Sequence, residues 1–306
     1  MNKPRPLRPG DHIALVSPAS PFSREEFDRG LEEIRRLGYV PVYDDDVFDR
    51  ARRYLSGTAE VRAEAFRRHW LDDRVAALIA VRGGYGSVQI LPLIGDLASR
   101  RAKLFIGYSD NTSVMSWLTC RHNIPALHGP MVDRRLARGT TAYDESSFLA
   151  LLRGGEGLML LPDGLVVLRP GETAGRLFGG TLTQLVASLG TPYAFDPPRG
   201  SILFIEDVNE RPYRIDRMLT QLRLAGVLSH ASGIVFGEMR DCDEPDGEWT
   251  ARDTINDLLH DFPGPVIFGF PSGHTTGPCW TLPLGVRVRL LTHPRPGVVV
   301  EESPVG

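Results

Sequence analysis

The chain has 306 residues, of which 42% are hydrophobic and 24% charged, a composition typical of a globular protein long enough for two domains. Its formal net charge of -3 argues against nucleic acid or an anionic membrane as the main partner, because neither attracts a mildly acidic protein. No apolar run approaches the roughly eighteen residues of a membrane helix, so none is expected. The run 13–16 is also too short for the core of a signal peptide, and we expect a cytoplasmic location.

Cysteine and histidine are sparse. The three cysteines, Cys120, Cys242 and Cys279, are odd in number and far apart, which favours reduced thiols over a disulfide framework or a zinc site. No H-x-x-x-H or C-x-x-C pair occurs among the scattered histidines and cysteines. We therefore expect neither a metal nor a cofactor.

The first 155 residues alternate short apolar runs with amphipathic segments, which predicts strands separated by helices. The predicted strands are 11–17, 40–43, 75–81, 103–107 and 125–128. The predicted helices are 24–37, 59–71, one starting at 87, and 111–121. Strands that are apolar on both faces indicate an α/β domain whose parallel sheet is covered on both sides. Ligands gather at the carboxyl ends of the strands in such sheets.

A serine follows one of these strands directly. In KLFIGYSDNTSVMSW (103–117), Gly107 permits a sharp turn, and Ser109 stands where the next helix begins. A serine at such a corner exposes its hydroxyl above the sheet, as a nucleophile would. The alternative is that Ser109 is a plain N-cap of that helix.

A glycine cluster follows the neighbouring strand 75–81. Arg82-Gly83-Gly84-Tyr85-Gly86 lets the backbone approach a ligand closely and present N–H groups to negative charge. The spacing is not that of a dinucleotide fingerprint. Three interpretations stay open: a phosphate site, a turn without function, and a cradle for an anion or oxyanion.

Glycines and prolines in 154–175 predict a hairpin around Pro162-Asp163-Gly164 and a boundary between domains 1–155 and 156–306. The second part is predicted to be mixed α and β. Its expected strands are 201–205, 233–236, 266–268, 280–291 and 298–301, and its expected helices are 179–189, 213–225 and 251–260.

Two positions in this second part offer chemistry. Glu206 and Asp207 end an apolar strand, where a buried carboxylate needs a specific hydrogen-bond partner. The alternative is that both carboxylates merely cap the next helix or pair with nearby arginines. His274 lies on a glycine-rich loop. A serine on an elbow, a carboxylate at a strand end and a loop histidine are the parts of a nucleophilic triad. The N–H groups of Gly84 and Asp110 could then stabilise an oxyanion.

The ordered blocks of this chain resemble the LD-carboxypeptidase family of serine peptidases. The matching segments are SPAS (17–20), VRGGYGS (81–87), FIGYSDNT (105–112), LHGPM (127–131), GGTLTQL (179–185), ILFIEDVNE (202–210), YRIDRML (213–219), GFPSGH (269–274) and TLPLG (281–285). The resemblance implies Ser109 as nucleophile, Glu206 as triad acid and His274 as base, with Asp207 as a neighbour. It also implies a flavodoxin-like amino-terminal domain, a smaller mixed α/β carboxy-terminal domain, a site at their junction, no metal and a homodimer.

Members of that family cleave the amide between an L-centre of a diamino acid and the terminal D-alanine of murein tetrapeptides during wall recycling. A carboxypeptidase must bind a free terminal carboxylate, which a bidentate arginine suits best. Arg82 is our first candidate and Arg214 the second, with Gly83 and Tyr85 as further substrate-binding residues. For either arginine the alternative is a structural pair with a nearby carboxylate.

Two other functions are compatible with the same residues. A branch of the family resembles self-immunity enzymes that hydrolyse peptidyl or aminoacyl nucleotides such as microcin C. No tryptophan occurs in 175–201, where an adenine-stacking residue would be expected. The second alternative is a binding module without catalysis, whose glycine cradle would hold a nucleotide or sugar phosphate. A glutamine amidotransferase is disfavoured because Cys120 lies inside a predicted helix.

Overall fold

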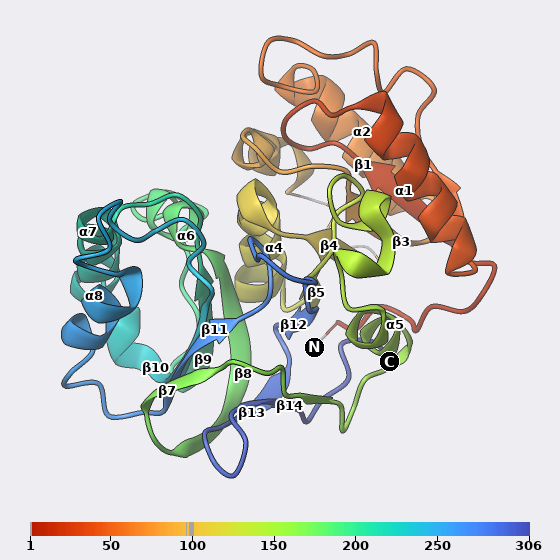
Figure 1. The fold of residues 1–306 in the computed structure, drawn as a ribbon. Coiled ribbons are helices and arrows are strands. Elements are labelled where there is room, and N and C mark those ends of the chain that lie inside the picture. Colours follow the sequence, from red (N-terminus) through yellow and green to blue (C-terminus); the bar gives the residue numbers. More distant parts are fainter. Residues whose placement is uncertain (1, 96, 98–100) are drawn as a thin grey trace.

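The computed structural model of the protein describes residues 2–95, 97 and 101–306. Two β-sheets run through the molecule, and Figure 1 shows the first half of the chain beside the second, with helices packed against each sheet. The expected α/β architecture is confirmed. Within the described residues, the structure contains no helix with the length and apolar character to cross a membrane.

The first sheet has the strand order β12-β5-β4-β3-β1-β2. Its parallel strands are β1 (His12–Val16), β2 (Val40–Val42), β3 (Val75–Ala80), β4 (Leu104–Gly107) and β5 (Ala126–His128). The order 2-1-3-4-5 is that of flavodoxin-like sheets, as the family resemblance implies. All residues of β3 and β4 are buried, which explains their continuous apolar sequence.

The first helix of this half buries one apolar stripe. In α1 (Arg24–Arg36), Phe27, Gly30, Leu31 and Ile34 recur at helical spacing and are the buried residues. The other helices are α2 (Ala59–Leu71), α3 (Leu91–Ile94), α4 (Thr112–Ser116) and α5 (Glu145–Arg153). Shorter helical turns are Ser87–Ile90, Ser109–Asn111, Trp117–Arg121 and Leu136–Thr141.

The second sheet has eight strands in the order β6-β14-β13-β8-β9-β10-β11-β7. The four strands β8 (Glu172–Thr181), β9 (Ser201–Glu206), β10 (Ala231–Gly237) and β11 (Val266–Phe270) are parallel to one another. The antiparallel strands β6 (Met159–Leu160), β14 (Gly297–Val300), β13 (Arg287–Leu291) and β7 (Val166–Arg169) flank them. The sheet therefore contains both parallel and antiparallel strands, and the second part of the chain combines helices with strands, as predicted.

The two faces of this second sheet are buried differently. On the outer face, α6 (Leu182–Ala187), α7 (Pro212–Leu224) and α8 (Ala251–Leu258) enclose a core that includes Leu203 and Phe236 (Figure 1). On the inner face, Phe204 and Val235 belong to the same core as the first sheet. This shared apolar core holds the two halves together.

The predicted hairpin around Pro162-Asp163-Gly164 is wrong. The strands on either side of it, β6 and β7, do not pair with each other but form opposite edges of the eight-stranded sheet. The long strand β8 was not predicted, because its sequence ETAGRLFGGT is polar and glycine-rich and lacks a strand's alternation. Its last residues, 179–181, were assigned to a helix that in fact begins at Leu182.

The predicted strand 280–291 is two strands in two different sheets. β12 (Leu282–Leu284) pairs antiparallel with β5 in the first sheet, whereas β13 pairs with β8 in the second. Between them Gly285 has a φ of 86°, a backbone conformation that bends the chain from one sheet to the other. The carboxy-terminal half of the chain thus completes the amino-terminal sheet.

The close approach of β8 to β9 predicts one strongly destabilising substitution. Gly179 has a φ of 144°, and a Cβ there would stand 2.7 Å from the carbonyl carbon of Phe204. Because that neighbour is sheet backbone, Gly179→Ala should lower the free energy of unfolding by ~2–4 kcal/mol. Urea denaturation measures the change.

Gly190→Ala is the matched control. Gly190 also has a positive φ, 77°, but a Cβ added there would have no heavy atom within 4 Å. Backbone strain alone should cost about 1 kcal/mol there. Equal effects of the two substitutions would contradict the steric account of Gly179.

Candidate active site

Ser109 occupies a strained corner directly after β4. Its φ of 63° lies in the left-handed region that residues with a Cβ seldom adopt. The N-cap of the helical turn Ser109–Asn111 is Tyr108, and no side chain caps that turn. The structure therefore contradicts the alternative that Ser109 is a plain N-cap. Its half-buried side chain instead lines a cavity, as at a strained strand-to-helix elbow.

The glycine cradle lies against this elbow. A Cβ on Gly83 would stand 2.7 Å from the Cβ of Ser109 and 2.9 Å from its Oγ, so only glycine leaves the serine room. The amide nitrogen of Asp110 lies 3.5 Å from the same point. Gly83 and the backbone nitrogen of Asp110 therefore both lie close to the serine side chain.

Neighbouring side chains fix the cradle in place. Ser20 accepts a hydrogen bond from the N–H of Tyr85 (3.1 Å), and its own N–H donates to the carbonyl of Gly83 (3.2 Å). The Asn111 amide donates to the carbonyls of Arg82 and Tyr108, both at 3.2 Å. Segments after three adjacent strands, β1, β3 and β4, thus brace one another at the carboxyl edge of the sheet.

Glu206 ends β9 and contacts His274. Its Oε2 accepts the backbone N–H of His274 at 3.0 Å and lies 2.8 Å from the imidazole Nδ1. The Thr181 hydroxyl donates to the other oxygen, Oε1. Asp207 instead accepts the N–H and hydroxyl of Thr183 at the start of α6, at 2.9 and 2.8 Å. Of the two adjacent carboxylates, Glu206 alone is placed to orient the imidazole.

A second histidine stands on the far side of the same carboxylate. His128 ends β5 and is fully buried, with Nδ1 2.8 Å from the Ser272 hydroxyl and Nε2 4.0 Å from Glu206 Oε1. Burial lowers the pKa of His128 to about 4, so its ring is neutral at neutral pH. Gly273 packs against both groups: a Cβ there would lie 2.8 Å from the Glu206 carboxyl and 2.8 Å from the His128 ring.

Charge pairing sets the protonation of this buried pair. Burial on its own raises the pKa of Glu206, but the adjacent His274 imidazole, with His128 and the Thr181 hydroxyl, lowers it overall. Burial lowers the pKa of His274, and the charge of Arg135 lowers it further. The charge and hydrogen bond of Glu206, together with the charge of Asp207, outweigh both and raise the pKa above its ordinary value. The imidazole therefore binds a proton more readily than a free histidine does.

Ser109 and His274 line one cavity of about 580 Å³. Among the described residues no hydrogen bond joins the two side chains; such contacts often form only with substrate bound. The cavity wall also includes the predicted residues Arg82, Gly83 and Gly84. The remaining wall residues are Tyr108, Met131, Asp133, Arg134, Val208, Asn209, Arg240 and Asp241.

Two of the predicted substrate-binding residues lie outside that wall. Tyr85 is half-exposed and packs near Tyr54, with ring centroids 6.0 Å apart. Arg214 projects from α7 beside Glu210 at 3.4 Å. Arg82 lines the cavity, with its Nε 3.7 Å from the buried carboxylate of Asp133, whose pKa burial raises to about 6.

Several residues of the site were not predicted from the sequence, namely Ser20, His128, Thr181, Arg134 and Arg240. Ser20 and His128 belong to blocks that carry the family resemblance, SPAS and LHGPM, but no local pattern gives them a role. Thr181 ends the strand that the sequence did not predict, and the two arginines occupy ordinary polar loops.

Comparisons with known proteins match both halves of the chain to one family. The LD-carboxypeptidase N-terminal domain family matches residues 13–129, and the LD-carboxypeptidase C-terminal domain family matches residues 174–290. A putative carboxypeptidase of Synechocystis sp. is 36% identical over 293 residues, covering 94% of both chains. A probable murein peptide carboxypeptidase of Bacillus subtilis is 31% identical, covering 97% of this chain and 94% of its own.

Solved structures extend the comparison. The microcin C7 self-immunity protein MccF superposes with a TM-score of 0.89 at 23% identity, covering all of both chains, which establishes a shared fold. A muramoyltetrapeptide carboxypeptidase from Oxalobacter formigenes has a TM-score of 0.77 at 29% identity, covering 94% of this chain and 97% of its own.

Fold, site and relatives together define a hydrolase of the serine-type carboxypeptidase class. Within that class, the chain belongs to the LD-carboxypeptidase family.

The raised pKa of His274 predicts the pH dependence of activity. If His274 is the general base, its protonated form cannot accept the serine proton, and kcat/KM should fall at acid pH with a midpoint above the ordinary 6.5. Glu206→Gln removes the stabilising charge, which should move the midpoint to lower pH and reduce kcat on the order of 10⁴-fold. Histidine NMR titration follows the same proton directly. An unchanged His274 midpoint in the variant would contradict the pairing.

Proposed function

We propose that this protein hydrolyses the amide between the L-centre of a diamino acid and the terminal D-alanine of murein tetrapeptides, using Ser109, His274 and Glu206. One observation carries the proposal: the His274 imidazole is hydrogen-bonded to buried Glu206 and lines the same cavity as Ser109, whose backbone is strained. The relatives named as murein peptide carboxypeptidases support the substrate. Wall recycling, a cytoplasmic location and a homodimer are further proposals, based on the family resemblance.

The proposed reaction begins at the serine hydroxyl. Ser109 Oγ attacks the carbonyl carbon while His274 Nε2 takes its proton, because the Nδ1–H is committed to Glu206. Negative charge then develops on the carbonyl oxygen, and the N–H groups of Gly84 and Asp110 would stabilise it. His274 returns the proton to the nitrogen of D-alanine, which leaves as the free amino acid. Water, deprotonated by His274, then hydrolyses the acyl ester and regenerates the serine.

A microcin-immunity activity is the second candidate, favoured by the full-length superposition on MccF. The aromatic side chains of the cavity weigh against it, because an adenine-stacking residue was expected from 175–201. In the described part of the chain Tyr108 lines the Ser109 cavity, and no tryptophan does. Tyr193, within 175–201, lines a separate cavity with Trp117. A non-catalytic module is disfavoured, since binding alone gives no reason for an imidazole that is hydrogen-bonded to a buried carboxylate in the cavity of Ser109.

One experiment tests the function and its alternative together. Purified protein is incubated with a murein tetrapeptide and, separately, with an aminoacyl sulfamoyl adenylate, and each mass is followed by mass spectrometry. We expect loss of the tetrapeptide and release of D-alanine, with Ser109→Ala slower by about 10⁴-fold or more. A fluorophosphonate should label the wild type but not this variant. Consumption of the adenylate alone would favour the immunity activity, and an unlabelled, folded wild type would favour the binding module.

Arg82 is proposed to bind the terminal carboxylate, because it lines the cavity beside the cradle. Arg82→Lys cannot form a bidentate pair and should raise KM about 10-fold for the free acid. A substrate amidated at that terminus should be affected little. Equal loss on both substrates would instead indicate that Arg82 only pairs with Asp133.

A further inference from the structure

His128 brings the first sheet into contact with the carboxylate that orients His274. It ends β5, and in the register of that sheet it lies opposite Gly107, two residues before Ser109. Its Nε2 lies 4.0 Å from Oε1 of Glu206, which ends β9 in the second sheet. One side chain therefore links the strand beside the serine elbow to the carboxylate of the other half.

Packing fixes the orientation of this ring. His128 is fully buried, and its ring meets that of Phe204 edge to face, with centroids 4.8 Å apart. Nδ1 lies 2.8 Å from the Ser272 hydroxyl. Gly273 leaves room for the close approach, because a Cβ there would stand 2.8 Å from the ring and from the Glu206 carboxyl. The imidazole therefore has little freedom to turn Nε2 away from the carboxylate.

The partner of Nδ1 determines which nitrogen of the neutral ring carries the proton. The Ser272 hydroxyl also lies 3.4 Å from the carbonyl oxygen of His128, a longer and weaker contact. The hydroxyl proton therefore belongs on the 2.8 Å contact, which makes Nδ1 the acceptor and leaves the ring proton on Nε2.

The surroundings of Nε2 agree with that tautomer. The atom is buried, has no hydrogen-bond partner among the residues that the structure describes, and faces Glu206. A lone pair there would be repelled by the negative charge of the carboxylate, whereas an N–H is attracted to it. His128 thus directs the positive end of a bond dipole at Glu206.

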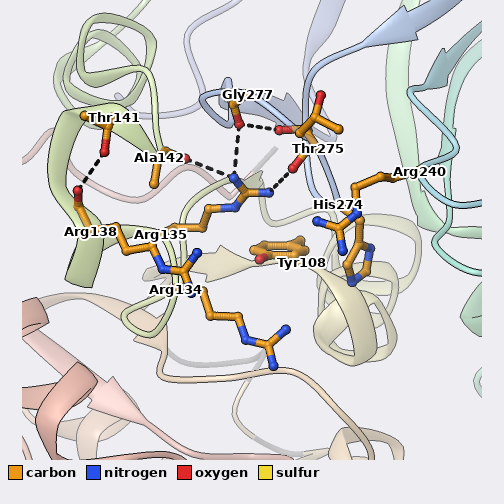
Figure 2. Close-up of a pocket in the computed structure, with 11 residues that line it drawn as sticks. Tyr108, Arg134, Arg135, Arg138, Thr141, Ala142, Arg240, His274, Thr275 and Gly277 are labelled. Atoms are coloured by element: carbon orange, nitrogen blue, oxygen red, sulfur yellow. Dashed lines mark hydrogen bonds between the residues drawn. The ribbon is translucent and has the colours of Figure 1, made fainter.

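The loop that carries His274 is fixed by an arginine. Arg135 is buried and donates to the carbonyl groups of Gly273 (2.8 Å), Thr275 (3.0 Å) and Gly277 (3.1 Å). Figure 2 draws the bonds to Thr275 and Gly277 as dashed lines. Because the loop is held in this way, the position and charge of Glu206 determine what the imidazole experiences from the buried side.

Charged groups surround His274 on its other side as well. It lines a second cavity, of about 430 Å³, whose wall includes Tyr108 and four arginines (Figure 2), namely Arg134, Arg135, Arg138 and Arg240. Cys279 accepts the N–H of Gly273 at 3.3 Å beneath the loop. After burial, which lowers it, the charge of Glu206 has the largest effect on the pKa of His274 and raises it; Asp207 raises it and Arg135 lowers it.

We propose that His128 is a positioning residue for the reaction: its neutral imidazole directs Nε2–H at Oε1 of Glu206, holds that carboxylate against the strand beside the serine elbow, and attenuates the negative charge that reaches His274. The inference rests on the proposed catalytic use of Ser109 and His274 and adds a residue to it. His128 lines neither cavity and acts only through Glu206.

Histidine NMR on the wild type tests the tautomer without any substrate. Nε2 of His128 should show the ¹⁵N shift of a protonated ring nitrogen, and Nδ1 that of an acceptor. The pattern should persist down to about pH 5, because burial lowers the pKa of this ring to about 4. The reversed pattern would overturn the proposal. This measurement decides the tautomer even where a variant does not fold.

His128→Leu removes the N–H and keeps the site apolar and filled. Without that dipole the charge of Glu206 acts undiminished, so the His274 midpoint should rise by about 0.5–1 pH unit, in NMR titration and in the acid limb of kcat/KM alike. On the alkaline plateau kcat should fall about 2- to 10-fold, the range of one hydrogen bond, with KM changed less than about threefold. His128→Gln keeps a neutral donor and should recover most of both effects.

His122→Leu is the matched control. His122 is a half-buried histidine whose ring packs on that of Trp117, with centroids 4.6 Å apart, and it lines neither cavity. Its loss should leave the His274 midpoint where it is in the wild type.

Two results with the His128→Leu enzyme would overturn the proposal. Equal loss of activity at every pH, with an unmoved His274 midpoint, would show that His128 only fills space. A midpoint that falls would show that Nε2 presents a lone pair to Glu206. If the wild type cleaves no peptide and Ser109 resists fluorophosphonate, the proposed function fails, whereas the NMR titrations still decide whether His128 acts on the carboxylate.

Discussion

The arrangement of the site depends on one buried carboxylate, that of Glu206. An ionised group taken out of water costs several kcal/mol unless its oxygens are paired. Here Oε2 receives two N–H groups of His274, and Oε1 receives the hydroxyl of Thr181. Glu206 itself ends β9, and its partners come from the end of β8 and from the loop after β11, so pairing one charge fixes three segments relative to one another.

The two halves of the chain contribute different parts of the site. The first sheet supplies the serine elbow and the glycine cradle, and the second supplies the carboxylate and the histidine. A common apolar core joins the two sheets, and β12, a strand from the second half of the chain, pairs with β5 in the first sheet. These contacts set the separation of the two sheets. A shift between the sheets would change the separation of the imidazole and the hydroxyl, which line one cavity.

Charge is distributed unevenly over the molecule. The whole chain has a formal net charge of -3, yet arginines line both cavities at its centre. Two of them, Arg134 and Arg135, are adjacent in sequence and differ completely in environment. Arg135 is buried and saturates its hydrogen bonds on loop carbonyls, whereas Arg134 is exposed to the cavities. The first provides rigidity to the wall, and the second provides its charge.

The sequence by itself determined the local features. Continuous apolar runs predicted β3, β4 and β9, because strands buried on both faces need no polar positions. The elbow at Ser109 and the cradle from Arg82 to Gly86 were recognisable because the conformation of a turn depends on adjacent residues, here glycines. Tertiary structure decided the rest: that β6 and β7 lie at opposite sheet edges, that β12 crosses to the first sheet, and that His128, Thr181 and Arg134 reach the site. Those positions depend on partners more than twenty residues away, and no local pattern encodes a contact that only the packing of two sheets creates.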